Sequence, residues 1–302
     1  LPKNDYVDSF VIADCLRFGR INKEVYMGDY RYKALQNLTR ARYFAVCNLV
    51  KEKQRFMNVL FKKYSTMTQA KVFSDTFSAT ALAVYDEFES AEALANMDLQ
   101  ELTEFIIEKG KNRFPDPDTV AKAIQKAARS SYRLPKTVND SVNQVLSISI
   151  TSMKALESQI KEFDKAISAQ MELLPNVLTS IPGIGPVFSA GIIAEIGDIN
   201  RFENHAQLAK YAGLAWKQHQ SGDFEAQNTR LIKSGNRFLK YYLCEAAFSL
   251  VRCDKEYKDF YHLKYKEVNR YQHKRALALT ARKFVRLVFA LLKDNRLYRP
   301  AE

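Results

Sequence analysis

"TSIPGIGPVFSAGIIAEIGDINRF", residues 179–202, joins a glycine-rich turn directly to an apolar run. The run predicts a helix from about Val187 to Ile196. The turn lacks the Gly-Lys-Ser/Thr of a Walker loop, and it matches the Gly-x-Gly-x-x-Gly of a dinucleotide-binding turn only weakly, after helical rather than strand sequence. Two interpretations remain, a grip on a nucleic-acid backbone or a plain connection between two packed helices.

The spacing around Gly183 and Gly185 looks like the helix-hairpin-helix motif of many DNA-handling proteins. Glycine tolerates positive φ and lets a backbone approach a ligand closely, and the following helix N-terminus offers unpaired N–H groups to a phosphate. Contacts of this kind position a nucleic acid without reading its sequence. Gly183 and Gly185 are therefore candidate nucleic-acid-binding residues.

Two long stretches precede the turn, residues 30–64 and 137–173, with apolar residues at helical spacing and no glycine or proline inside. In the second stretch the apolar positions alternate threes and fours, which predicts a coiled coil with residues 30–64 or with another chain. The predicted seam includes Val138, Val142 and Val145. Shorter helices, broken by Gly110 and the prolines of "FPDPD", predict a small helical insertion at about 71–135.

The region after the turn also reads as helical. We expect a short helix near 205–212, a loop over 214–229, and basic helices near 236–252 and 272–294. No series of alternating apolar and polar residues indicates strands, so the predicted fold class is mainly α.

Charge is concentrated at the C-terminal end of the sequence. The formal net charge is +12, and residues 217–300 hold 19 Lys or Arg against 8 Asp or Glu. This asymmetry favours a polyanionic partner, with nucleic acid preferred to a membrane surface. No apolar run approaches the roughly 20 residues of a membrane span, so a soluble intracellular protein is expected. The four scattered cysteines indicate free thiols.

Three blocks after the turn carry a family resemblance: "AEIGDINRF" (194–202), "LAKYAGLAWKQHQSG" (208–222) and "IKSGNRFLKYYLCEAA" (232–247). In this order they resemble the C-terminal domain of the IS110 family of insertion-sequence transposases, which includes RNA-guided bridge recombinases. "KNDYVDSFVIADCLR" (3–17) resembles the Lys-x-Asp-x-x-Asp-Ala segment of the same family, with Ser9 at the alanine position.

The resemblance implies three regions and their functions. Residues 1–29 would be the tail of a RuvC-like DEDD nuclease domain, residues 30–173 a helical and coiled-coil region with the insertion, and residues 174–302 the transposase domain. It implies that Ser221 is the nucleophile that attacks a DNA phosphate, and that Asp5 and Asp8 are the third and fourth acids of a set binding Mg²⁺. Trp216 departs from a proline that is frequent in the family.

Further residues are candidates for nucleic-acid contact. They are cations and one amide that follow the serine: Lys233, Asn236, Arg237, Arg275, Arg282, Lys283 and Arg286. His219 lies two residues before Ser221, and we interpret it as a surface or phosphate-contacting residue instead of a catalytic base.

The resemblance also implies partners and a location. DNA, a structured guide RNA and a homo-oligomer are expected in the bacterial cytoplasm, associated with the nucleoid. The sequence starts with Leu1 and not Met, so we expect a C-terminal part of a longer transposase that is inactive alone, since half of its acidic set would lie upstream. The alternative function is a non-catalytic helical module that binds nucleic acid and oligomerises.

Overall fold

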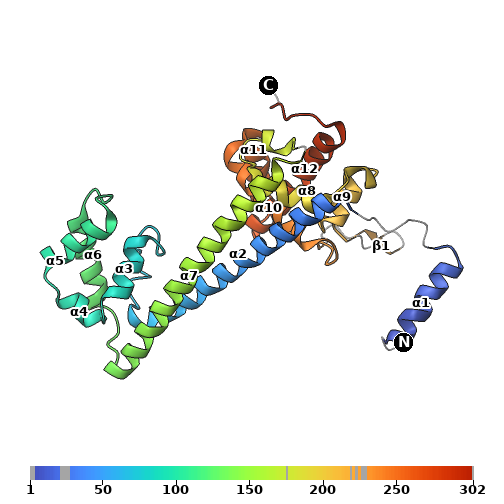
Figure 1. The fold of residues 1–302 in the computed structure, drawn as a ribbon. Coiled ribbons are helices and arrows are strands. Elements are labelled where there is room, and N and C mark those ends of the chain that lie inside the picture. The colour runs from blue at the N-terminus through green and yellow to red at the C-terminus, as the bar shows by residue number, and fades with distance from the viewer. Residues whose placement is uncertain are drawn as a thin grey trace. The chain divides into compact units, whose positions relative to one another are not determined.

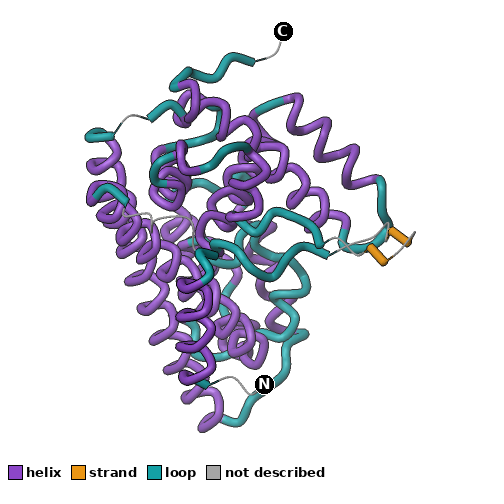
Figure 2. Tube along the Cα trace, turned by 90° about the vertical axis from the view of Figure 1, so that its right-hand side faces the viewer, coloured by secondary structure: helices purple, strands orange, loops and turns teal. Residues whose placement is uncertain are grey.

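The computed structural model describes residues 4–20, 28–174, 176–217, 220–221, 224–225 and 230–300. These residues form two compact units, one of residues 1–37 and 176–302 and the other of residues 38–175. Helices dominate the described chain (Figure 2), and the two strands described, β1 and β2, are each two residues long. The predicted mainly α class is confirmed. In the described parts of the chain, no helix has the length and apolar character to cross a bilayer.

Six helices make up the unit of residues 38–175, the first of them extending from the other unit. They are α2 (Tyr30–Lys63), α3 (Ala79–Glu87), α4 (Ala91–Asn96), α5 (Leu99–Gly110), α6 (Pro117–Arg129) and α7 (Lys136–Met171). Within this unit α2 and α7 run antiparallel, side by side (Figure 1), and they are joined by the ion pairs Arg42–Asp164 and Lys53–Glu157. The two long predicted helices are confirmed, and they pair by folding back within one chain.

The core of this unit lies where α2 and α7 meet the short helices of the insertion. Phe56 and Leu60 of α2 and Leu146 of α7 are fully buried there with residues of α3 to α6. Val138 and Val145, which were predicted to lie in the seam, are 43% and 47% exposed instead. The insertion packs against a different face of α7. Tertiary contacts, and not the heptad pattern, therefore determine which face of α7 is buried.

The chain enters and leaves the insertion at one narrow neck. Thr66 Oγ1 donates to Ser130 O at 2.9 Å, and the backbone N–H of Tyr132 donates to Ser65 Oγ at 3.2 Å. These bonds close residues 66–130 into a small body of four helices between the ends of α2 and α7. The bounds of this body lie within about five residues of those expected for the insertion, about 71–135.

A buried lysine lies at the C-terminal end of α2. Lys63 is 1% exposed, and its ammonium donates to Tyr85 O at 2.9 Å. Burial lowers the pKa of Lys63 to about 8, against the attraction of Asp86 and Glu89. Since an unfolded chain restores an ordinary pKa of about 10.4, the unfolded state binds more protons between these two values.

Stability of this unit should therefore rise with pH relative to a Lys63→Met variant. Between pH 8 and 10 we expect the free energy of unfolding of the wild type to rise by about 2 kcal/mol relative to that of Lys63→Met. The reason is that the unfavourable buried charge is lost as the pH rises through the folded-state pKa. Hydrogen exchange of peptides covering residues 60–90 measures this, and Lys62→Met, an exposed neighbour, is the control. Identical pH profiles for wild type and Lys63→Met would contradict the assignment.

The unit of residues 1–37 and 176–302 contains the remaining elements. They are α1 (Asp5–Arg17), η1 (Leu178–Ser180), α8 (Pro186–Ile196), η2 (Ile199–Arg201), α9 (His205–Tyr211), β1 (Gln220–Ser221), β2 (Phe224–Glu225), α10 (Arg237–Cys253), α11 (Lys255–Lys266) and α12 (Gln272–Asp294). Helices α8, α10 and α12 supply its buried core, with Ile192, Leu243 and Phe284 fully buried. The predicted helices of this region are confirmed, and α11 is an additional one.

Candidate functional site

A narrow antiparallel ribbon carries Ser221. Its base is formed by the bridge between Trp216 and Leu231 and by the bond from Lys217 N to Arg230 O at 2.9 Å. Towards the tip, β1 pairs with β2, and Ser221 is opposite Phe224. The predicted loop is therefore partly paired, and Ser221 occupies the last pair before the turn. His219 lies outside the described residues, and only the backbone of Ser221 is described.

Two glycines fix the base of the ribbon. Gly213 and Gly235 both have positive φ, 69° and 125°. A Cβ on Gly235 would lie 2.6 Å from the backbone N of Gly213, so the two loops touch backbone to backbone. Only glycine meets both demands at once. The "YAGL" and "KSGN" blocks therefore hold together the two ends of the ribbon that presents Ser221.

A buried carboxylate supports the same base. Glu195 of α8 is 2% exposed, and its Oε2 accepts from Asn236 Nδ2 at 2.7 Å and from Gln36 Nε2 at 3.1 Å. Asn236 Nδ2 also donates to Tyr211 Oη at 3.2 Å, and Asn236 N donates to Tyr211 O at 2.7 Å. Beside this network is a cavity of about 200 Å³, partly lined by Tyr32.

The contacts of Asn236 contradict its predicted role as a phosphate ligand. Its Oδ1 accepts from the backbone N–H groups of Phe238 and Leu239, both at 3.0 Å, so it caps α10. Its amide hydrogens are used by Glu195 and Tyr211. Asn236 therefore organises the site from inside. Glu195 was missed by sequence reasoning, although it is the only charged residue of an otherwise apolar helix.

The two glycines of the turn differ from one another. Gly183 has φ 80°, and a Cβ there would lie 2.8 Å from Cys253 Sγ and 2.9 Å from Ser249 Oγ. Ser249 Oγ also donates to Gly183 O at 2.7 Å. Gly185 has an ordinary φ of −80°, caps α8, and has open space where a Cβ would be. Gly183 is thus a packing residue against α10, and Gly185 alone keeps an open approach to a helix N-terminus.

The four cations predicted on the basic face of α12 fall into two pairs that differ in their contacts. Arg275 pairs with Glu267 at 2.8 Å, and Lys283 pairs with Glu256 of α11 at 2.7 Å. These two cations are partly neutralised, and they hold the C-terminal helices together. They are weaker candidates for phosphate contact than the sequence indicated.

The other two cations of α12 that were predicted to contact nucleic acid, Arg282 and Arg286, lie on the side that faces α9. Arg282 Nη1 donates to His205 O at 3.2 Å, and Arg286 is exposed. Burial and the charge of Arg286 lower the pKa of Arg282. The pKa of His205 is lowered, first by burial and then by the charges of Arg282 and Arg286. Its Nδ1 has no hydrogen-bond partner within the described part of the chain. Unneutralised positive charge is therefore concentrated here.

Lys233 and Arg237 are exposed beside the ribbon base. The Arg237 guanidinium lies over the ring of Phe238, 4.7 Å from its centroid. A cation over an aromatic ring is attracted to the face of that ring, which helps to hold its direction. Both residues keep positions that suit phosphate contact.

Asp5 and Asp8 lie in the first turn of α1, and both are exposed. Asn4 Oδ1 caps the helix by accepting from Val7 N at 2.8 Å. No group of three or more potential metal ligands occurs among the residues whose placement is described. The pair offers two hard oxygen donors one helical turn apart, which suits Mg²⁺, an ion that proteins bind with one or two carboxylates.

Two segments of the sequence, one containing the ribbon and one containing the paired acids, match models of transposase families. The model of the family described as "Transposase IS116/IS110/IS902 family" matches residues 176–262. That of the DEDD transposases of IS110 elements, described as "Transposase", matches residues 2–64. The first match contains the whole ribbon, and the second contains Asp5 and Asp8.

Curated relatives are insertion-element proteins. An IS116 protein of Streptomyces clavuligerus is 28% identical over 99% of this chain and 73% of its own length. An IS110 protein of Streptomyces coelicolor is 29% identical over 57% of this chain and 46% of its own length. The transposase of IS1111A from Coxiella burnetii is 29% identical over 52% of this chain and 44% of its own length.

These matches identify the class of protein as a transposase of insertion sequences. More particularly, residues 2–64 and 176–262 match transposase domains of the IS110/IS116/IS902 family. It spans 73% of the IS116 relative and less than half of the other two.

Proposed function

We propose that the protein cleaves and rejoins DNA strands through a covalent bond between Ser221 and a DNA phosphate. The observation that carries the proposal is the position of Ser221 in the last pair of a ribbon whose base is fixed by Gly213 and Gly235. A nucleophile must be presented outward on a rigid support, because misplacement by about 1 Å can cost two orders of magnitude in rate. The test is a protein–DNA adduct assay with Ser221→Ala.

The proposed step balances without an outside oxidant or energy source. The Ser221 hydroxyl loses its proton, its Oγ forms an ester bond with phosphorus, and one P–O bond of the DNA strand breaks. The leaving strand oxygen takes up a proton as a hydroxyl. The reverse attack by the hydroxyl of another strand restores a phosphodiester and frees the serine.

Asp5 and Asp8 are proposed to hold Mg²⁺ as part of a four-acid set. When bound, the ion supplies charge stabilisation to the phosphate and lowers the pKa of an attacking hydroxyl. The two carboxylates contribute hard oxygen donors from one face of α1. Lys233, Arg237, Arg282 and Arg286 are proposed to hold the DNA backbone near the serine.

The surface of α1 supports its assignment to a larger nuclease domain. Apolar side chains are strongly exposed along it, including Tyr6 at 81%, Phe10 at 66% and Leu16 at 61%. Exposed apolar patches of this kind usually cover an interaction surface. We therefore propose that α1 packs against a RuvC-like body that also carries the other two acids, and that residues 1–302 alone bind nucleic acid without recombining it.

Oligomerisation is proposed to complete the active site. On α7, Val138, Val145 and Ile148 are 43%, 47% and 60% exposed at spacings of seven and three residues, which suits pairing with a second coil. A guide RNA and a location at the bacterial nucleoid belong to the same proposal, by resemblance to the family. A non-catalytic module that binds nucleic acid and oligomerises is the rival, and it is favoured by the helix-hairpin-helix-like turn.

Gly185→Val should weaken nucleic-acid binding by about tenfold while the fold is kept. The branched side chain would occupy the open space through which a phosphate reaches the N-terminus of α8, and a tenfold loss corresponds to about 1.4 kcal/mol. Fluorescence anisotropy with a labelled duplex at fixed salt measures the change. Gly185→Ala is the matched control and should lose much less. Unchanged affinity in Gly185→Val would identify the turn as a plain connection.

A further inference from the structure

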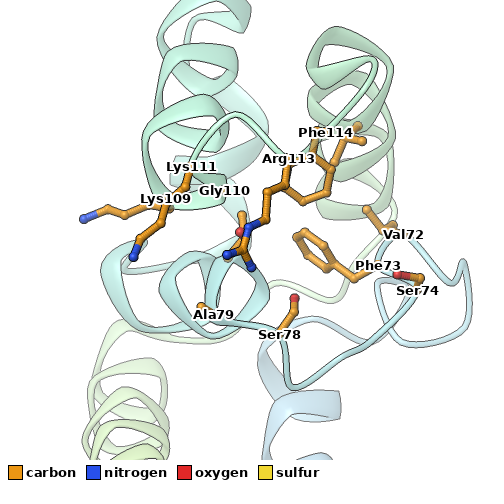
Figure 3. Close-up of a pocket in the computed structure, with 12 residues that line it drawn as sticks. Val72, Phe73, Ser74, Ser78, Ala79, Lys109, Gly110, Lys111, Arg113 and Phe114 are labelled. Carbon is orange, nitrogen blue, oxygen red and sulfur yellow. The ribbon is translucent and has the colours of Figure 1, made fainter.

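A basic pocket lies in the insertion, which belongs to a different unit from the serine and the acids. Its volume is about 460 Å³, and its lining includes Phe73, Ser78, Lys109, Lys111, Arg113 and Phe114 (Figure 3). The size is in the range of pockets that take small organic ligands. Three of its lining residues are cations, and none is an acid.

Two of these cations are available for a ligand. The third cation, Lys109, already has a partner, because its ammonium forms an ion pair with Glu87 at 2.7 Å. The side chains of Lys111 and Arg113 are exposed and make no hydrogen bond or ion pair with any part of the chain that the structure describes. In Figure 3 the guanidinium of Arg113 projects across the group of lining side chains towards Ser78.

The loop after α5 places an aromatic wall beside these charges. A Cβ on Gly110 would lie 2.6 Å from the Phe114 ring, so this ring lies directly against the glycine. Lys111 and Asn112 then have φ of 51° and 55°, which turns the chain sharply. Phe73 is only 7% exposed and forms the floor, whereas Phe114 stays partly exposed.

The positive charge of the pocket is local. Residues 71–135 hold 11 Asp or Glu against 8 Lys or Arg, so the insertion as a whole is acidic. An acidic body repels a polyanion except where cations gather without acids. Recognition at this pocket therefore requires a ligand that enters it, and a duplex lying on the general surface would not suffice.

We propose that this pocket binds one unstacked nucleotide of a single-stranded nucleic acid. The base stacks on Phe114 above Phe73, and the adjoining phosphates contact Lys111 and Arg113. Aromatic faces and free cations are the shared features of single-strand binding sites, which accept any base because every base has a π-face. The site is independent of the proposed strand chemistry, since it shares no residue with it.

A photo-crosslinking experiment on the full 302-residue chain tests the site. Tetranucleotides containing 4-thiouridine, or 4-thiothymidine in the DNA series, are irradiated with the protein, and tryptic peptides are mapped. We expect crosslinks on the peptide of residues 114–122, which begins with Phe114. Mapping by peptide separates this pocket from any binding by the basic C-terminal helices, and the two series distinguish RNA from DNA.

The double variant Lys111→Gln and Arg113→Gln lacks two tryptic sites, so its matching peptide is residues 110–122. This variant should reduce the crosslink yield on that peptide about tenfold, and Phe114→Leu should reduce the yield on residues 114–122 similarly while keeping the apolar packing. Lys126→Gln is the control, since Lys126 is exposed on α6 outside the pocket. Ser221→Ala should leave the yield unchanged. Crosslinks confined to residues 176–302, or equal yields in the variants and wild type, would overturn the proposal, as would equal competition by polyglutamate, because charge alone would then be recognised.

Discussion

Ser221→Ala should abolish the covalent protein–DNA adduct completely. The experiment uses the longer protein that we propose, with the other two acids of the set, together with element DNA and the proposed guide RNA, and detects the adduct by its slow migration after denaturation and nuclease digestion. Alanine lacks the oxygen that forms the ester bond, so no weaker version of the reaction remains. DNA binding should persist, because affinity comes mainly from phosphate contacts by cations.

The control for this variant is Ser234→Ala. Ser234 is an exposed serine at the base of the same ribbon, and its backbone oxygen, not its side chain, is the atom that a Cβ on Gly213 would meet, at 3.0 Å. Its adduct yield should equal that of wild type. Asp5→Asn and Asp8→Asn should lower adduct formation while binding remains. An adduct of normal yield in Ser221→Ala would eliminate the proposed nucleophile and leave the non-catalytic module as the better account.

Gly191→Ala should cause a large loss of stability in this domain. A Cβ at Gly191 would lie 2.3 Å from Cγ of Tyr242, whose ring is fully buried between α8 and α10. Overpacking of this kind costs about 1–3 kcal/mol and sometimes more, and the rigid ring favours the upper end. The higher helix propensity of alanine offsets about 1 kcal/mol. We therefore expect a net loss of at least about 2 kcal/mol.

Urea unfolding followed by tryptophan fluorescence measures the loss of stability in the unit that contains Gly191. The chain has one tryptophan, Trp216, and it lies at the base of the ribbon. Gly185→Ala is the matched control at the start of the same helix, and its midpoint should barely change because the added carbon meets nothing within 4 Å. A midpoint for Gly191→Ala equal to that of the control would show that α8 and α10 separate easily.

Most of the helical architecture could be predicted from the sequence, because apolar residues recur at helical spacing along the long amphipathic stretches. Helix α11, "KEYKDFYHLKYK", was missed since it has one aliphatic residue and mixes charges with aromatics. Its position depends on tertiary contacts, such as the Lys283–Glu256 ion pair with α12. The exposure of Val138 and Val145 has the same cause, since the insertion decides which face of α7 is covered.

The candidate site was predicted less completely. Family resemblance selected Ser221, and sequence blocks selected the glycines, but spacing alone could not tell Gly183, packed on α10, from Gly185, which is open. Asn236 looked like a phosphate ligand because it is polar and lies among cations, whereas its partners Glu195 and Tyr211 come from distant parts of the sequence. Roles that depend on such partners are visible only in three dimensions.

The neck at Thr66 and Ser130 makes the insertion a replaceable cassette. Because its two ends are hydrogen-bonded to each other, a different body could join α2 to α7 at the same point, provided that it covers the apolar side chains of Phe56, Leu60 and Leu146. Related chains could therefore differ in this body while keeping the same junction. An engineer could graft another domain with a matching apolar face there and leave residues 176–302 unchanged.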